Sequence, residues 1–139
     1  MDIKELINEA LDARKKAYSP YSKYKVGAAL LCRNGKVCKG CNIENASYGA
    51  TNCAERTAVF KAVSEGDTDF EAIVIAGGPE GDDPENLSDY ASPCGICRQV
   101  LSEFSADGEL MVILARSVQD HKTFKLKELL PESFNNSVL

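Results

Sequence analysis

The 139-residue sequence predicts an α/β fold, with one three-layer α/β/α domain over residues 1–139 and a mixed sheet of about five strands. Three observations lead to this prediction. Helix-like and strand-like segments follow one another in the order α-β-β-α-β-α-β. The first strand-like segment is apolar on both faces, which requires a sheet covered on two sides. No repeat, linker or low-complexity tract divides the chain, whose length is ordinary for one domain.

The first element is a predicted helix. Residues 3–17 place apolar side chains at helical spacing, and Asp2 followed three residues later by Glu5 is typical of a capping box. We expect the helix to end at Ser19-Pro20, because proline removes a hydrogen-bond donor and disfavours helix in the residue before it.

A hairpin is predicted next. Val26 to Cys32 is the segment that is apolar on both faces, and Lys36 to Ile43 is the second strand-like run. Asn34-Gly35 lies between them, and this dipeptide is the strongest short-range signal of a hairpin because both of its residues accept a positive φ.

The rest of the chain alternates between helices and strands. The expected elements are a mostly buried helix at Ala54 to Val63, a buried strand at Ala72 to Ala76, a helix around Cys97 to Phe104, a strand at Leu110 to Ala115, and a short helix at Leu126 to Leu130 that stops at Pro131. Residues Gly77 to Ser92, rich in Gly, Pro and Asp, are expected to form a loop.

Composition excludes several classes of function. A net charge of −5 argues against a nucleic-acid polymer as the main partner, since such binding depends on clustered Lys and Arg. No apolar run approaches the roughly 20 residues of a membrane span. The charged N-terminus lacks the apolar core of a signal peptide, so a cytoplasmic location is expected. In a reducing compartment, the six cysteines indicate metal or redox chemistry rather than a disulfide framework.

Three cysteines form a candidate metal site. Cys53 precedes one predicted helix, and the pair Cys94 and Cys97 lies at the start of another, where the helix dipole and free N–H groups stabilise thiolates. A structural zinc site normally has four protein ligands, whereas a catalytic site keeps one position for water, whose pKa zinc lowers. Three ligands therefore predict one catalytic Zn²⁺ per chain.

Charged residues beside the ligands have predicted roles in catalysis. Glu55 lies two residues from Cys53, where its carboxylate can move a proton between water and substrate without binding the metal. Three thiolates over-neutralise Zn²⁺, and a guanidinium hydrogen bond to sulfur would withdraw charge. Arg56 is the main candidate for that donor, and Arg98 is the second.

Other interpretations of the cysteines remain open at this point. A thioredoxin-like redox pair would explain Cys94 and Cys97, but it would not explain Cys53 or Glu55. A structural zinc module that binds protein predicts a closed metal site and no role for Glu55. Taken alone, Glu55 and the two arginines would be solvated helix-start charges.

The cysteine motifs resemble a known enzyme family. Cys53-x-Glu55 with Pro93-Cys94-x-x-Cys97 matches the Cys₃ form of the zinc deaminase signature. The wider sequence is similar to the small cytidine deaminases of the cytidine/deoxycytidylate deaminase family over nearly the whole chain. The segments that carry this resemblance are Pro20 to Ala29, Gly40 to Tyr48, Cys53 to Ala58, Ser92 to Val100 and Leu129 to Phe134.

The resemblance implies a reaction and a substrate. Such enzymes hydrolyse cytidine and 2′-deoxycytidine to uridine, 2′-deoxyuridine and ammonia in pyrimidine salvage, with Glu55 protonating N3 and later the leaving amine. Asn42 and Glu44 match the residues that hold the ribose hydroxyls, and they also share one strand face, as their alternation predicts. Tyr24 and Ala54 match residues that contact the substrate, although the aromatic at position 24 is usually Phe.

The resemblance also implies an assembly. Cys₃ members form homotetramers whose sites borrow residues from neighbouring subunits, which gives Ala46, Tyr48 and Phe134 roles in an adjacent pocket. Without the resemblance, Tyr48 and Phe134 would be core or interface aromatics.

Two questions of specificity stay open in the sequence. An aminonucleoside such as blasticidin S is an alternative substrate, although the N-I-E-N motif at 42–45 favours an ordinary nucleoside. Single-stranded polynucleotide is disfavoured because the chain lacks a basic, aromatic strand-binding face.

The acidic segment, residues 78–91, is expected to be a solvated surface loop, with a place at the pocket mouth as the alternative.

Overall fold

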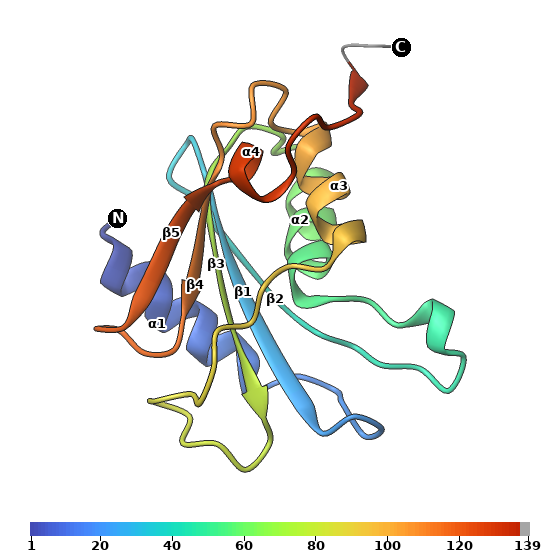
Figure 1. Ribbon diagram of the computed structural model, residues 1–139, viewed down its shortest axis with the longest axis vertical. Helices are drawn as coiled ribbons and strands as arrows, with labels where there is room; N and C mark the ends of the chain where they lie inside the picture. The colour runs from blue at the N-terminus through green and yellow to red at the C-terminus, as the bar shows by residue number, and fades with distance from the viewer. Residues whose placement is uncertain (137–139) are drawn as a thin grey trace.

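Five strands form one mixed sheet in the computed structural model, which describes residues 1–136 (Figure 1). The strand order is β2-β1-β3-β4-β5, and within it only β3 and β4 are parallel neighbours. The predicted α/β class and mixed sheet are thus confirmed. The strands are β1 (Tyr24–Cys32), β2 (Val37–Cys41), β3 (Phe70–Pro79), β4 (Met111–Ala115) and β5 (His121–Lys125).

Helices cover both faces of this sheet, as the apolar first strand required. Figure 1 shows α1 on one side and α2 and α3 on the other. Side chains alternate along β1, so that Ala28 and Leu30 pack on the α2 side, whereas Ala29 and Leu31 pack on the α1 side. The helices are α1 (Ile3–Arg14), α2 (Ala54–Ser64), α3 (Gly95–Glu103) and α4 (Leu126–Leu129), with a 3₁₀ turn, η1, at Tyr48–Ala50. None of the helices within residues 1–136 is long and apolar enough to cross a membrane.

Helix α1 ends three residues earlier than its apolar pattern predicts. Its last residue is Arg14 rather than residue 17. The chain leaves the helix because the next segment forms sheet-like contacts: the Tyr18 N–H donates to the Asn42 carbonyl at 3.0 Å, and the Glu44 N–H donates to the Tyr18 carbonyl at 2.8 Å. Tertiary hydrogen bonds therefore override local helix propensity here.

The predicted hairpin is present, but its turn differs from the expected one. Strand β1 ends at Cys32 and β2 begins at Val37, so four residues lie between the strands, more than a two-residue turn contains. Within the Asn34-Gly35 pair, only Gly35 has a positive φ, of 94°. The Asn34 side chain instead accepts a hydrogen bond from the Lys36 N–H at 3.0 Å, which closes the turn locally.

Close contact between β2 and α2 positions the start of α2. A Cβ atom at Gly40 would lie 2.5 Å from the Ala58 nitrogen and 2.6 Å from the Ala54 carbonyl oxygen. Only glycine permits this approach, because both opposing atoms belong to the helix backbone. The contact holds α2 directly on the sheet, and α2 begins at the residue that follows Cys53.

Candidate active site

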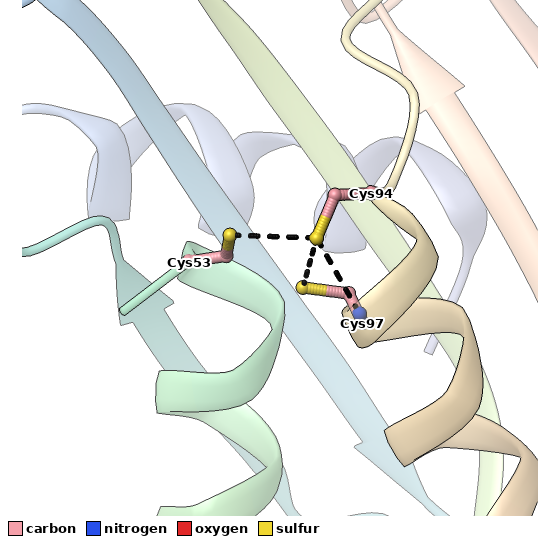
Figure 2. Close-up of side chains that lie close together, drawn as sticks. All are labelled: Cys53, Cys94 and Cys97. Carbon is pink, nitrogen blue, oxygen red and sulfur yellow. Dashed lines mark hydrogen bonds between the residues drawn. The ribbon is translucent and has the colours of Figure 1, made fainter. Parts of the chain in front are cut away.

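Two helix N-termini bring the predicted metal ligands together. Cys53 is the N-cap of α2, and Cys94 is the N-cap of α3, with Cys97 in its first turn. The Cys94 sulfur accepts a hydrogen bond from the Cys97 N–H at 3.5 Å. Figure 2 shows the three sulfurs pointing toward one another from the two helix starts. The dipoles of both helices favour negative charge at this point.

The sulfur geometry fits a zinc ion. The Cys53 and Cys94 sulfurs are 3.8 Å apart, the Cys94 and Cys97 sulfurs are 3.5 Å apart, and all three lie within 4.8 Å of one another. Tetrahedral zinc with Zn–S bonds of about 2.3 Å separates two ligand sulfurs by about 3.8 Å. A hydrogen bond from Cys97 lowers the pKa of Cys53 to about 5, which favours the thiolate that a metal needs.

Glu55 lies buried beside this cluster. Glu55 is only 4% exposed, yet it lines the pocket together with Cys53 and Cys94. Burial raises the pKa of Glu55 to about 7, and the negative charge of Cys53 acts in the same direction. A carboxyl group in such surroundings can both accept and donate a proton near neutral pH.

Arg56 supplies positive charge to the sulfurs. Its Nη2 donates to the Cys53 sulfur at 3.3 Å, and its buried Nε has no hydrogen-bond partner among the described residues. Burial acts to lower the pKa of Arg56, but hydrogen bonds to Cys53 and Cys97 hold it above its ordinary value. A guanidinium in this position suits an anionic metal–thiolate cluster.

Arg98 has different contacts from those its position beside Cys97 suggested. Its Nε donates to the Pro93 carbonyl at 2.8 Å, and its Nη1 donates to the Leu129 carbonyl at 2.6 Å. Its Nη2 donates to the Ser92 hydroxyl at 3.0 Å. All three of these partners are oxygens, and through Ser92 and Pro93 Arg98 fixes the segment that precedes Cys94.

A pocket of about 280 Å³ opens beside the sulfurs. The predicted site residues among its lining are Tyr24, Asn42, Cys53, Ala54, Glu55 and Cys94. The other lining residues had no individual role predicted from the sequence, although a place at the pocket mouth was the alternative for residues 78–91; they are Val26, Thr51, Asn52, Ile75, Tyr90, Ala91 and Ser92. Position beside the motifs was an available signal for Thr51, Asn52 and Ser92, which directly precede Cys53 or Pro93-Cys94.

The two predicted ribose-binding residues hold residues 21–26 in place through hydrogen bonds. The Asn42 Oδ1 accepts from the Val26 N–H at 2.9 Å, and its Nδ2 donates to the Tyr24 carbonyl at 2.8 Å. Glu44 accepts from the N–H groups of Tyr21 at 3.0 Å and Ser22 at 3.1 Å, and from the Ser22 hydroxyl. These hydrogen bonds, led by that of the Ser22 hydroxyl, lower the pKa of Glu44 and favour its ionised form.

The residues expected to serve a neighbouring subunit lie outside this pocket. Tyr48 is 77% exposed and Phe134 is 61% exposed, while Ala46 is also exposed. Tyr48 and Glu44 line a second hollow, which shares Thr51 with the pocket beside the sulfurs. The chain therefore presents these side chains to its surroundings.

The acidic segment has exposed charged residues, but its end lines the pocket. Its charged residues Asp83, Glu85 and Asp89 are exposed, as expected for a solvated loop. Its last two residues, Tyr90 and Ala91, nevertheless line the pocket. Strand β3 also extends to Pro79, so the loop begins later than the composition predicted.

Known proteins match this chain over almost its full length. Residues 1–113 match the family model described as the cytidine and deoxycytidylate deaminase zinc-binding region. A cytidine deaminase of Sporosarcina psychrophila is 46% identical over 139 residues, covering 100% of this chain and 96% of the relative. A cytidine deaminase of Halalkalibacterium halodurans is 48% identical over 134 residues, covering 96% and 95%.

A solved structure matches the fold as well. The crystal structure of a cytidine deaminase from Burkholderia pseudomallei superposes with a TM-score of 0.85 at 44% sequence identity. The match covers 96% of this chain and 100% of that one.

Proposed function

Because the chain belongs to the cytidine and deoxycytidylate deaminase family, we propose that it hydrolyses cytidine and 2′-deoxycytidine to uridine, 2′-deoxyuridine and ammonia. The family assignment made from the sequence motifs is confirmed, and with it the class of zinc-dependent hydrolytic deaminase. One observation carries the proposal: three sulfurs that fit zinc, two of them lining the pocket, lie beside a buried carboxyl group that lines the same pocket.

The three cysteines, Glu55 and Arg56 each have a role in this reaction. Cys53, Cys94 and Cys97 would hold one zinc ion, which supplies an acidified water as the nucleophile when it is bound. Glu55 would take one proton from water and deliver it to N3 of the base, and would then take a second proton from the hydroxyl added at C4 and deliver it to the leaving amine. Arg56 would offset the negative charge of the thiolates through its bond to Cys53.

The pocket walls support binding of a nucleoside. We assign substrate contacts to Tyr24, Asn42 and Ala54, which line the pocket, and to Glu44 at the adjoining hollow. We further propose a homotetramer in which Ala46, Tyr48 and Phe134 complete a neighbouring subunit's site. Both aromatic side chains are exposed and are therefore accessible to a neighbouring subunit, which supports this assembly.

The cellular role is part of the same proposal. We assign the enzyme to pyrimidine salvage in the cytoplasm, acting as one catalytic domain over residues 1–139. Thiolate ligands must stay reduced to bind zinc, which supports a reducing compartment. The negative net charge supports free nucleosides, rather than nucleic-acid polymers, as substrates.

The decisive experiment combines a metal assay with a product assay. Purified protein should contain about one zinc per chain and convert cytidine to uridine, and Glu55→Ala should lower turnover by at least about 10²-fold while keeping the metal. Blasticidin S belongs in the same assay as the competing substrate. Zinc-loaded protein that is inert on cytidine and deoxycytidine would contradict the proposal, and a fully active Glu55→Ala variant would contradict the role of Glu55.

A further inference from the structure

One wall of the pocket comes from the end of the acidic segment. Tyr90 and Ala91 line the pocket and also pack against the core on the α2 side of the sheet. Ala91 lies against Gly77 of β3, where an added Cβ would come within 2.9 Å of the Ala91 Cβ. The segment is thus fitted to the end of β3, three residues before the ligand Cys94.

The Tyr90 side chain is held from outside the pocket by the turn between β4 and β5. Its hydroxyl donates to the Asp120 carboxylate. The Lys122 ammonium lies 4.4 Å from the centroid of its ring, and the Arg116 guanidinium lies 5.5 Å from it. Asp120 also pairs with Arg116 at 3.5 Å, so both charges have a fixed partner.

The same turn holds the acidic segment at a second point. Leu87 is fully buried, its N–H donates to the Arg116 carbonyl at 2.8 Å, and its carbonyl accepts from the Arg116 Nε at 3.0 Å. Arg116 in turn donates its own N–H to the Asp120 carbonyl at 2.9 Å. Two attachments three residues apart remove most of the freedom that an acidic loop of this length would otherwise have.

We propose that Tyr90 contacts the bound nucleoside and that Asp120, which lies outside the pocket, is the positioning residue that holds Tyr90 in place. The inference rests on the proposed function, since it concerns the substrate of the same site. A wall residue contacts the substrate before and during the reaction alike, so loosening it weakens both states equally. The expected signature is a higher KM with little change in kcat.

Three variants of the zinc-loaded full chain test this assignment on cytidine. Tyr90→Phe removes only the donor, and Asp120→Ala removes the acceptor together with the ion pair to Arg116. Each should raise KM by about 3- to 10-fold, the effect of one lost hydrogen bond, with kcat changed by less than about twofold. The double variant should be no worse than the more severe single one, because both changes break the same contact.

Matched controls separate positioning from general damage. Tyr18→Phe changes an exposed tyrosine that lines neither the pocket nor the adjoining hollow, and it should leave both constants unchanged. Tyr90→Leu keeps apolar bulk without the hydroxyl or the ring, and it should raise KM at least as much as Tyr90→Phe. The melting temperature of every variant is measured alongside.

Three results would overturn the proposal. The first is a KM for Tyr90→Phe and Asp120→Ala within twofold of wild type. The second is a lower kcat that follows a lower melting temperature at constant KM, which indicates a purely structural role. The third is additive effects in the double variant. A wild type that does not deaminate cytidine would instead refute the proposed function, and the Tyr90 assignment with it.

Discussion

The metal end of the pocket and the Tyr90 wall differ in how much of each is set by neighbouring residues in the sequence. The ligands Cys94 and Cys97 are three residues apart on one helix start, and their contacts are set within a single turn. The wall depends on contacts between Tyr90 and Asp120 and between Leu87 and Arg116, which are 30 and 29 residues apart in sequence. The spacing of two of the three ligands is therefore encoded locally, whereas the approach of the third ligand, Cys53, and the shape of the pocket depend on distant parts of the chain.

Removing a zinc ligand should have the largest effect, because it disrupts the metal site itself. Cys97→Ala deletes a fully buried sulfur, so the protein should lose most of its zinc, and turnover should fall by more than about a hundredfold. Zinc content by atomic absorption and cytidine turnover measure both effects. Cys41→Ala is the control, because this half-buried thiol lies outside the sulfur cluster and its loss should leave the zinc in place. Zinc retained by Cys97→Ala would disprove the ligand assignment.

Substitution of the two arginines tests which of them acts on the zinc–thiolate cluster. Arg56→Gln removes the guanidinium that contacts Cys53, so turnover or zinc retention should fall by about 10- to 100-fold. Arg98→Gln removes bonds to oxygens and should lower the melting temperature without lowering the zinc content. Chelator competition and thermal unfolding distinguish the two. If Arg56→Gln leaves both turnover and metal retention unchanged, charge compensation by Arg56 is refuted.

The close contact between Gly40 of β2 and the backbone of α2 positions the helix that begins after Cys53. Gly40→Ala places a Cβ against the α2 backbone, and the overpacking should lower the free energy of unfolding by about 1–3 kcal/mol. Urea denaturation measures the change. Gly81→Ala is the matched control, because no atom lies within 4 Å of the added Cβ, and its effect should stay within about 0.5 kcal/mol. Equal effects of the two changes would show that the close contact carries no stability.

The smallest effect is expected from the charges of the acidic segment. Glu85 is exposed, and exposed charges are screened beyond about 8 Å at physiological ionic strength. Glu85→Gln should therefore leave the KM for cytidine within about twofold of wild type, with equal values at low and high salt. A marked salt-dependent change would mean that this segment acts on the substrate through charge as well as through packing.

This contrast explains what could be predicted from the sequence. The starts of α2 and α3 were predicted at the observed cysteines, because N-terminal helix positions and ligand spacing are local properties. The family and its zinc are confirmed by the comparisons. The individual roles of Asn42, Glu44 and Tyr24 remain predictions.

The missed features depend on long-range contacts. Strand β5 was not located because His121–Lys125 is mostly polar and exposed at the edge of the sheet, where no apolar pattern marks it. The end of α1 was placed too late because the pairing of Tyr18 with Asn42 cannot be seen in a helical pattern. A place at the pocket mouth was only the alternative for residues 78–91, because the partners that hold Tyr90 lie at the distant β4–β5 hairpin.

The parallel pairing of β3 and β4 has a consequence for how this enzyme can diversify. Parallel neighbours require the chain to return across the sheet, and here that return contains first the acidic segment and then α3. Insertions or deletions between Pro79 and Leu87 would lie in this crossover, ahead of the Arg98 contacts that fix the start of α3. The length of the segment between Pro79 and Leu87 can thus change without displacing the pocket wall or the metal ligands, because the contacts that hold Tyr90 and the start of α3 lie after it.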